Sequence, residues 1–285
     1  MESQTNRQTA TGQLFVVATP IGNLGDITFR AVEVLKNVDL IAAEDTRTSR
    51  KLLQHCGIST PMMALHEHNE EQAAKKLLSR LLQGESIALI SDAGTPLISD
   101  PGYHLVRKLR SEGIRITPIP GASSVLAGLC AAGLPTDHFR FEGFLPRSGS
   151  SRTTALQRLA ASNETNVILE SPHRLLKSLK DLMPLLEEQR ELVVARELTK
   201  LHEEFVSGSA GRLIEHFSER APRGEIVLMI GPALPKNRGD ITDSEIHSLL
   251  ETEAMQTLAP SARAKAVARE LGISKSRVYD LITGQ

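Results

Sequence analysis

The sequence is poor in aromatic side chains and in cysteine. Aromatic residues make up 3% of the 285 residues, and tryptophan is absent. This argues against a surface that binds nucleic acid mainly by stacking bases on aromatic rings. The two cysteines, Cys56 and Cys130, are far apart and lie in apolar helical surroundings. We therefore expect reduced core residues rather than a disulfide or a metal site.

Long apolar runs and a strong charge of either sign are also missing. No run approaches the ~18 apolar residues of a membrane span, and the polar stretch 1–12 lacks the apolar core of a signal peptide. We therefore expect a cytoplasmic protein without a membrane partner. The net charge is −1, so any nucleic-acid surface must be a local basic patch. Residues 66–69 (His-Glu-His-Asn) have the side chains of a metal site but lack a third ligand at a recognisable spacing, so we expect no metal.

Short β-type runs alternate with helical patterns, which is typical of βα units and a largely parallel sheet. The pattern predicts an α/β protein with two α/β domains, residues 13–121 and 122–234, a disordered tail at 1–12 and a helical appendage at 235–285. The expected strands of the two domains are Leu14–Ala18, Leu40–Ala43, Met62–Leu65, Ile87–Ile90 and Ile114–Ile119, then Phe139–Gly143, Asn166–Glu170, Leu192–Arg196, Thr199–Ser207 and Glu225–Ile230. The expected helices are Asp26–Leu35, Thr46–Gln54, Glu70–Leu82 and Tyr103–Arg110, a crossing helix Ala122–Ala132, then Arg152–Ala161, His173–Leu186 and Gly211–Arg220.

The most informative segment is the signature loop, residues 91–102 (Ser-Asp-Ala-Gly-Thr-Pro-Leu-Ile-Ser-Asp-Pro-Gly). It directly follows the apolar run Ile87–Ile90 and precedes a helical pattern. Ligands of open α/β sheets bind in the crevice at the carboxyl ends of the strands, where backbone amides and carboxylates are exposed. The sequence therefore predicts a ligand-binding loop here, without naming the ligand.

Other strand ends carry segments with both a functional and a purely structural interpretation. The first loop, residues 19–26, contains neither G-x-G-x-x-G nor a Walker motif, which disfavours dehydrogenases and P-loop NTPases. A plain βα turn and a ligand loop both remain open. Residues 44–47 (Glu-Asp-Thr-Arg) suit substrate contact or an N-capped helix. Lys200 is either a surface or a cleft residue, and residues 143–152, with two arginines and no acid, form a linker or hold phosphates.

The appendage has a helix-turn-helix pattern. Small and apolar residues from Ala264 to Leu271 are followed by the turn 272–274 and by a basic second helix with Lys275 and Arg277. Residues 241–256 carry acidic side chains and no Lys or Arg, so the appendage is charge-polarised. The unit either serves packing alone or contacts nucleic acid.

Taken together, these segments resemble the bacterial ribosomal small subunit methyltransferase I family. The match covers roughly Leu14 to the end. It consists of the first loop, the signature loop and the basic tail, together with residues 43–47, 142–146 and 196–200 in the same order. The resemblance implies a 16S rRNA (cytidine-2′-O)-methyltransferase with the tetrapyrrole methylase (class III methyltransferase) fold. It also implies S-adenosylmethionine as the cofactor and a homodimer.

In that fold the cofactor binds, folded up, between the two α/β domains. Related enzymes commonly have Gly-Asp-Pro where this chain has Gly94-Thr95-Pro96, which makes Asp92 the candidate for the displaced carboxylate. The cofactor residues that the resemblance implies are Pro20, Ile21, Asp92, Gly94, Thr95, Ile98, Ser123, Ser124, Leu169, Glu170, Ala195, Gly224 and Glu225.

Methyl transfer to a ribose hydroxyl requires an aligned, water-free site and help in removing the proton. A base, or a cation that stabilises the developing alkoxide, supplies that help. Charge at the strand ends of both domains makes Lys200, Glu44 and Asp45 the catalytic candidates, with Arg47 orienting phosphate or substrate.

The chain can form a local basic surface for RNA although its net charge is close to zero. The RNA-binding candidates are Arg47, Arg147, Arg152, Arg174, Arg263, Lys275 and Arg277.

Two alternative functions stay open. One is a methyltransferase that acts on a tetrapyrrole or another small molecule, and the other is a non-catalytic RNA-binding protein on the same scaffold.

Overall fold

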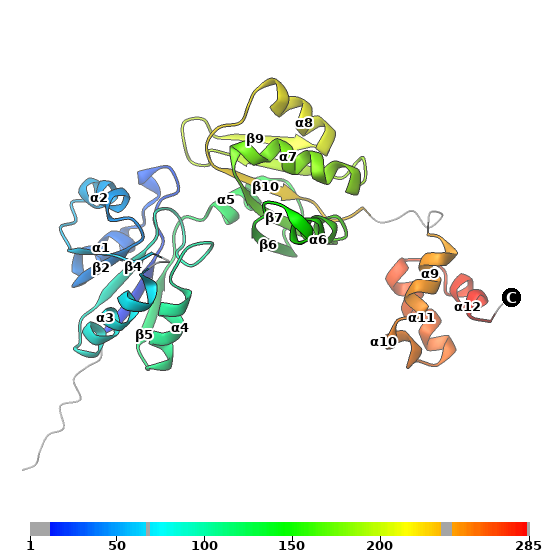
Figure 1. The fold of residues 1–285 in the computed structure, drawn as a ribbon, viewed down its shortest axis with the longest axis horizontal. Helices are drawn as coiled ribbons and strands as arrows, with labels where there is room; N and C mark the ends of the chain where they lie inside the picture. The colour runs from blue at the N-terminus through cyan, green and yellow to red at the C-terminus, as the bar shows by residue number, and fades with distance from the viewer. Residues whose placement is uncertain (1–11, 67–68, 235–240, 284–285) are drawn as a thin grey trace, which may run out of the picture. The chain divides into compact units, whose positions relative to one another are not determined.

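The computed structural model describes residues 12–66, 69–234 and 241–283. Most of the expected tail at 1–12, Glu67 and His68 of the segment 66–69, and residues 235–240 and 284–285 of the expected appendage lie outside the described residues. The chain divides after Ala233 into two compact units (Figure 1). Within the described residues, no helix combines the length and the apolar character that crossing a membrane requires.

The first sheet has five strands in the order β3-β2-β4-β1-β5, and every neighbouring pair is parallel, as predicted. Its first helix begins later than expected, because the Thr28 side chain caps the amide of Ala31 and residues 24–26 form a separate turn. The strands are β1 Gln13–Val17, β2 Leu40–Ala43, β3 Met62–Ala64, β4 Ile87–Ile90 and β5 Arg115–Ile119. The helical segments are η1 Leu24–Asp26, α1 Phe29–Asn37, α2 Thr46–His55, α3 Glu70–Leu82 and α4 Tyr103–Ser111.

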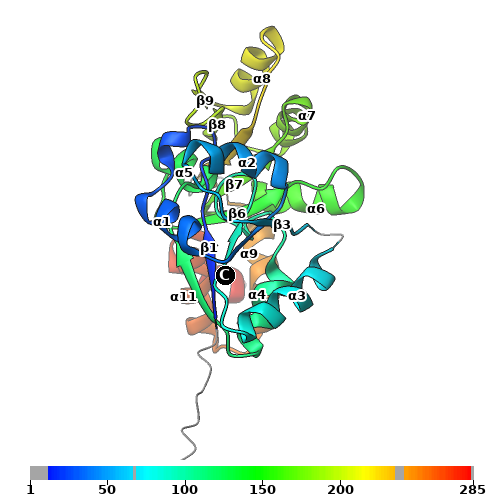
Figure 2. The same ribbon diagram turned by 90° about the vertical axis from the view of Figure 1, so that its left-hand side faces the viewer.

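Helices cover both faces of this sheet (Figure 1, Figure 2). Successive side chains of a strand point to opposite faces. In β4, Ile87 and Leu89 pack with α3 and α4, whereas Ala88 and Ile90 pack with α1 and α2. Burial on both faces explains why β2 and β4 are apolar throughout.

The strands β1 and β4 are neighbours, but the chain leaves them toward opposite faces. The first loop leads from β1 to α1 on one face, and the signature loop leads from β4 to α4 on the other. Such a topological switch point opens a crevice beyond the carboxyl ends of the two strands. The fold therefore places the two loops that the sequence singled out on either side of one crevice.

The second sheet, in the order β6-β7-β10-β8-β9, differs from the expectation. Only β6 and β7 are parallel, while the three other pairs are antiparallel. The expectation of a largely parallel sheet is therefore wrong for this half of the chain. The strands are β6 Phe139–Phe144, β7 Thr165–Glu170, β8 Leu192–Arg196, β9 Glu204–Gly208 and β10 Ile226–Ile230. The helical segments are α5 Ser124–Ala131, α6 Gly149–Ala160, α7 Pro172–Leu182, η2 Met183–Leu185 and α8 Ala210–Glu219.

The expected strand 199–207 begins only at Glu204. Because β8 and β9 are antiparallel, with Arg196 paired to Glu204, the chain must reverse between them. Residues 197–203 form this reversal, in which the amide of Lys200 bonds to the carbonyl of Glu197 at 3.0 Å. We call this segment the β8–β9 loop. It places Lys200 at a loop rather than at the start of a strand.

The two faces of the second sheet are covered differently. One face packs against α6, α7 and α8. The other packs against α5 and against Ile21 of the first loop, which is 7% exposed. The first loop is thus part of the core of the second sheet. On α5, Val125 and Leu129 are buried, but Cys130 is exposed, so the expectation of a core residue is wrong for Cys130.

The second unit consists of helices with a core of their own. Its first helix begins with a capping box between Thr242 and Glu245. Residues 272–274 separate the last two helices, as the helix-turn-helix pattern predicts, and Val278 of the last helix is fully buried. The helices are α9 Asp243–Leu250, α10 Glu253–Gln256, α11 Pro260–Leu271 and α12 Lys275–Thr283.

One buried cation ties the end of α6 to the end of β10. Arg190 is 0% exposed, and its guanidinium donates to the carbonyls of Gly231 (2.7 Å), Ala160 (2.9 Å), Ser162 (3.0 Å) and Leu159 (3.3 Å). We expect Arg190→Met to lower the free energy of unfolding by about 3 kcal/mol, because it leaves buried carbonyls without donors. Denaturant titration of both proteins measures the difference.

The matched control is Arg110→Met, since Arg110 is exposed on α4. This substitution should change the free energy of unfolding by less than about 0.5 kcal/mol. Equal stabilities of the two variants would contradict the role given to Arg190.

Candidate functional site

The first loop and the signature loop are hydrogen-bonded to each other. The amide of Thr19 donates to the carbonyl of Gly94 at 2.8 Å, the amide of Gly94 donates back to Thr19 at 3.0 Å, and the Thr19 hydroxyl bonds to the carbonyl of Ser91 at 3.2 Å. Gly94 has φ +81°, a conformation that side chains disfavour. Backbone hydrogen bonds therefore hold the first loop and the signature loop together at the switch-point crevice.

The signature loop also contacts two other predicted segments. Its Thr95 hydroxyl bonds to the carbonyl of Ala122 at 3.2 Å, just before α5. The Asp92 carboxylate accepts the amide of Asp45 at 3.0 Å, and the amide of Asp92 points to the Glu44 carboxylate at 3.4 Å. The structure thus brings the first loop, residues 44–47, the signature loop and the domain crossing together.

Backbone strain is concentrated in two loops. Of the non-glycine residues that the structure describes, four have positive φ: Leu97 (72°) and Ser99 (67°) in the signature loop, and Glu197 (53°) and Thr199 (65°) in the β8–β9 loop. Such conformations persist only where the surroundings enforce them, and they cluster at ligand sites. The two strained loops therefore mark the functional part of the first unit.

A cleft of about 380 Å³ lies between segments of both sheets, within the usual range for small-ligand sites. It is lined by the signature loop, by Ser124 at the start of α5, by the end of β7, and by residues at the start of β10. The predicted cofactor residues that line it are Ile21, Ile98, Ser124, Leu169, Glu170, Gly224 and Glu225.

The remaining predicted cofactor residues do not line this cleft. Pro20, Asp92, Gly94 and Thr95 lie in the bonded loops around its mouth. Ser123 caps α5 by accepting the amide of Leu126 at 3.4 Å. Ala195 is 0% exposed in the core of the second sheet, so its methyl group belongs to that core.

Nine residues of the cleft lining were not among the predicted ones, Asp100, Phe144 and Leu198 among them. Asp100 lies in the signature loop itself, so its neighbours could have pointed to it. Phe144 is 57% exposed at the end of β6, beyond a bulge between Phe141 and Gly143, and Leu198 lies in the β8–β9 loop. Both belong to segments that carry the family resemblance, but their position at the cleft depends on the bulge and the reversal, which arise from strand pairing.

The cleft is acidic. Its described lining contains Asp100, Glu170 and Glu225 but no Lys or Arg. Burial raises the pKa of Asp100 above its usual value, although a hydrogen bond from Ser91 opposes the shift. Burial also raises the pKa of Asp92. An arrangement of this kind suits a ligand with positive charge and disfavours one that carries phosphates.

Lys200 lies beside the cleft in an ionic cluster. Its Nζ is 2.9 Å from Glu197 Oε1 and 3.3 Å from Glu225 Oε2. Burial disfavours its charge, but the hydrogen bond to Glu197 and the charge of Glu225 outweigh that effect, and the pKa of Lys200 is raised. Lys200 is therefore a cation at neutral pH and not a general base.

A close approach holds this lysine against the first loop. A Cβ on Gly22 would lie 2.4 Å from Lys200 Cγ and 2.9 Å from the carbonyl of Leu198. Only glycine permits this contact without displacing the β8–β9 loop. Gly22 therefore fixes how the first loop meets the second sheet.

Asp45 has the structural role that the sequence left open. It caps α2 by accepting the amide of Arg47 at 2.8 Å, and its carboxylate also pairs with the Arg47 guanidinium at 2.8 Å. The hydrogen bond from the Arg47 side chain lowers the pKa of Asp45 to about 2. A carboxylate this weakly basic is a poor proton acceptor at neutral pH, so its place among the catalytic candidates is corrected.

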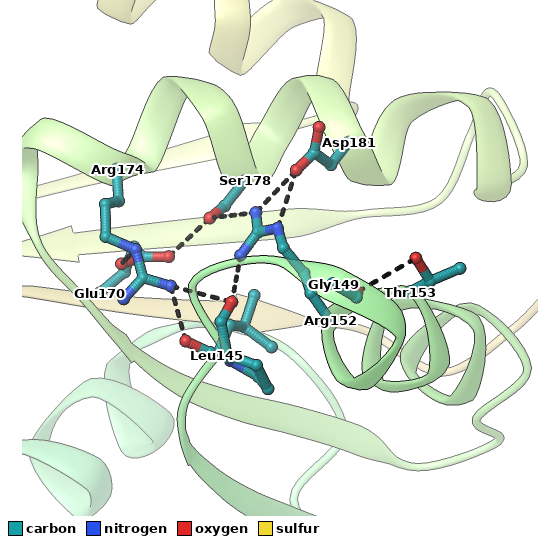
Figure 3. A network of polar contacts seen from close by, with 9 residues as sticks. Leu145, Gly149, Arg152, Thr153, Glu170, Arg174, Ser178 and Asp181 are labelled. Carbon is teal, nitrogen blue, oxygen red and sulfur yellow. Dashed lines mark hydrogen bonds and ion pairs between the residues drawn. The ribbon is translucent and has the colours of Figure 1, made fainter.

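Two arginines predicted to bind RNA instead hold the chain after β6 (Figure 3). Arg152, 5% exposed, bonds to Asp181 (2.9 Å), Ser178 (3.1 Å) and the carbonyl of Pro146 (3.0 Å). Arg174 bonds to the carbonyl of Leu145 at 2.6 Å and lies 3.5 Å from the buried Glu170. The RNA role of Arg152 is corrected, since its guanidinium is inside the protein. Arg147 in the same segment is exposed.

The basic residues of the helical unit are placed differently from one another. Lys275 is exposed and bonds to Ser261 at 2.8 Å. Arg277 pairs with Asp243 at 2.8 Å and joins α12 to α9. Arg263 is half-buried, and its Nε has no hydrogen-bond partner among the described residues. Across the part of the chain that the structure describes, no three His, Cys, Asp or Glu side chains are grouped to hold a metal.

Comparison with solved structures agrees with the fold. A cobalt precorrin-4 methyltransferase of cobalamin biosynthesis matches with a TM-score of 0.60 at 19% identity, over 77% of this chain and 94% of that chain. A uroporphyrin-III C-methyl transferase from Thermus thermophilus, complexed with S-adenyl homocysteine, matches with a TM-score of 0.55 at 19% identity, over 77% and 97%. At these identities the likeness establishes the fold alone.

Sequence comparison establishes the family. The family model for Tetrapyrrole (Corrin/Porphyrin) Methylases matches residues 13–214, more than half of the chain. The ribosomal RNA small subunit methyltransferase I of Synechocystis sp. is 46% identical over 270 residues, covering 95% of this chain and 97% of that protein. The protein of the same name from Escherichia coli O157:H7 is 46% identical over 282 residues, covering 98% and 97%. The chain belongs to the ribosomal RNA small subunit methyltransferase I family, within the tetrapyrrole methylases.

Proposed function

We propose that this protein transfers the methyl group of S-adenosylmethionine to the ribose 2′-hydroxyl of a cytidine in 16S rRNA of the small ribosomal subunit. One observation carries the proposal: 46% identity to ribosomal RNA small subunit methyltransferases I extends over 98% of the chain, helical unit included. The porphyrin and corrin methyltransferases share only the fold. RNA is therefore favoured over a tetrapyrrole as the acceptor.

The residues of the cleft fit the cofactor. S-adenosylmethionine has a flat aromatic adenine, two ribose hydroxyls, one carboxylate, and positive charges on its sulfonium and ammonium groups. Ile21, Ile98 and Leu198 provide apolar surface, and Asp100 and Glu225 provide carboxylates, of which Glu225 also pairs with Lys200 beside the cleft. When bound there, the cofactor supplies an electrophilic methyl carbon on a positively charged sulfur.

The remaining chemistry belongs to residues near the cleft. Lys200, held as a cation by Glu197 and Glu225, stabilises negative charge as it develops on the acceptor oxygen. Glu44 and Asp92 lie together at the ends of β2 and β4. This pair accepts the proton of the ribose hydroxyl, because burial raises the pKa of Asp92 and makes its carboxylate more basic than usual. Arg47 is paired with Asp45, but 88% of its side chain is exposed, and we assign it the orientation of a phosphate.

Two further features of the proposal concern the assembly and its location. A homodimer is part of the proposal, as the family resemblance implies. Phe29 and Leu201, 99% and 92% exposed, are large apolar side chains that a second copy could cover. A small-subunit RNA substrate places the protein in the cytoplasm.

The direct test uses labelled S-adenosylmethionine and small ribosomal subunits that lack the modification. We expect the label to enter 16S rRNA at one cytidine, on the ribose rather than the base. Mapping by mass spectrometry of nuclease fragments identifies the nucleotide. Label on the base, or in a tetrapyrrole offered in parallel but not in RNA, would refute the proposed reaction.

The role of Lys200 is tested by removing its charge while keeping its length. We expect Lys200→Met to lower the single-turnover rate about 10²-fold or more, as for other donors that stabilise transition-state charge, and to leave cofactor affinity nearly unchanged. Lys200→Arg should recover part of the rate. Lys177→Met, at an exposed position on α7, is the control. A wild-type rate for Lys200→Met would remove this residue from the mechanism.

The helical unit is tested by ending the chain after Ala233, where the first unit ends. Because the cleft residues all precede this point, calorimetry should show unchanged cofactor binding. Binding to small subunits should weaken and depend less steeply on salt, since phosphate contacts are lost. An unchanged affinity and salt dependence would show that the unit takes no part in RNA binding.

A further inference from the structure

A second, polar cavity lies behind the β8–β9 loop. It has a volume of about 790 Å³ and is formed by this loop, by the end of α8 and by residues 220–223, which lead into β10. Five of its side chains are basic or can become so. We call it the arginine groove, after Arg196, Arg220 and Arg223, which it contains together with His202 and His216.

The acids of the groove are largely matched by fixed partners. Glu204 pairs with Arg196 at 3.0 Å, and Glu197 pairs with Lys200 at 2.9 Å. Arg220 and Arg223 are exposed and form no ion pair with another described residue, and Glu219 is the third acid of the groove. The groove therefore retains cationic groups for an external anion.

Hydrogen bonds from Arg196 hold one side of the groove in place. Arg196 donates to Glu204 from Nε and to the carbonyl of Arg223 from its terminal nitrogen at 3.2 Å. These bonds attach the segment with Arg223 to the end of β8. The segment with the two exposed arginines is thus held at both ends, by the bond from Arg196 to Arg223 and by the bond of the Arg220 amide to the carbonyl of His216 at the end of α8 (3.2 Å).

The groove and the acidic cleft share a wall. Glu197 lines the groove, and its Oε1 accepts the amide of Glu225, a cleft residue, at 3.1 Å. Arg223 and the cleft residue Gly224 are consecutive in the chain. A chain molecule whose reacting group lies at the cleft can therefore continue directly into the groove, with opposite charge preferences in the two places.

We propose that the arginine groove binds backbone phosphates of the RNA next to the nucleotide that is methylated. The proposal rests on the proposed function for the identity of the polymer. Arg220 and Arg223 contact phosphate oxygens, for which the planar guanidinium is well suited. The acidic cleft accepts the positively charged cofactor, and the arginines of the groove bind the RNA backbone outside the cleft.

The test replaces both free arginines, giving Arg220→Gln/Arg223→Gln in the full-length protein. The probe is small ribosomal subunits that lack the modification, titrated at several salt concentrations. Loss of two phosphate contacts on single-stranded RNA should reduce the slope of log affinity against log salt by about 1.4 and weaken binding about tenfold. Cofactor affinity and the rate at saturating subunits should stay within twofold of wild type, because neither arginine lines the cleft.

The matched control is Arg107→Gln/Arg110→Gln, which removes the same charge from two exposed positions of α4. It should leave the salt slope unchanged, and Arg220→Lys/Arg223→Lys should restore most of it. An unchanged slope in the groove variant, or equal losses in groove and control variants, would overturn the proposal. If the wild-type protein methylated no RNA of the small subunit, the proposed reaction would be refuted. The difference in salt slope between wild type and the groove variant would still show whether the groove binds RNA.

Discussion

The contact between the first loop and the second sheet is the constraint on which the functional part of this protein depends. Ile21 is buried in the core of the second sheet, and Gly22 approaches the β8–β9 loop so closely that a Cβ would lie 2.4 Å from Lys200. The same loop is bonded to the signature loop through Thr19. The cleft has walls from both sheets because the first loop is bonded to the signature loop of the first sheet and is packed into the core of the second.

Charge is segregated on the two sides of the β8–β9 loop. The described lining of the cleft has acids and no Lys or Arg, whereas the groove behind the loop has three arginines beside three glutamates, two of which are paired with cations. Glu197 lies between them, and its pKa is lowered chiefly by the hydrogen bond from Lys200. A cationic donor and a polyanionic acceptor require such opposite fields within a short distance. The strained backbone at Glu197 and Thr199 is the conformational cost of this arrangement.

Much of the local structure could be predicted from the sequence, because it depends on local patterns. The strands Leu40–Ala43, Ile87–Ile90 and Leu192–Arg196 agree residue for residue with their predicted bounds, since buried strands are short apolar runs between turn residues. The antiparallel pairing of the second sheet was missed. Strands alternating with helices suggest parallel pairing, and the direction of β10 between β7 and β8 depends on contacts far apart in the chain.

The sequence by itself determined the family, the α/β class and the segments that form the site, because motifs and periodicity are properties of neighbouring residues. Only the tertiary structure decided which charged side chains are available for chemistry. Arg152 and Arg147 look equivalent in the sequence, yet one is buried against Asp181 and the other is exposed. Lys200 and Asp45 both follow strands, yet one forms a cationic cluster at the cleft and the other caps a helix. Burial and pairing depend on what the rest of the chain places around a residue, and this decides its charge and its role.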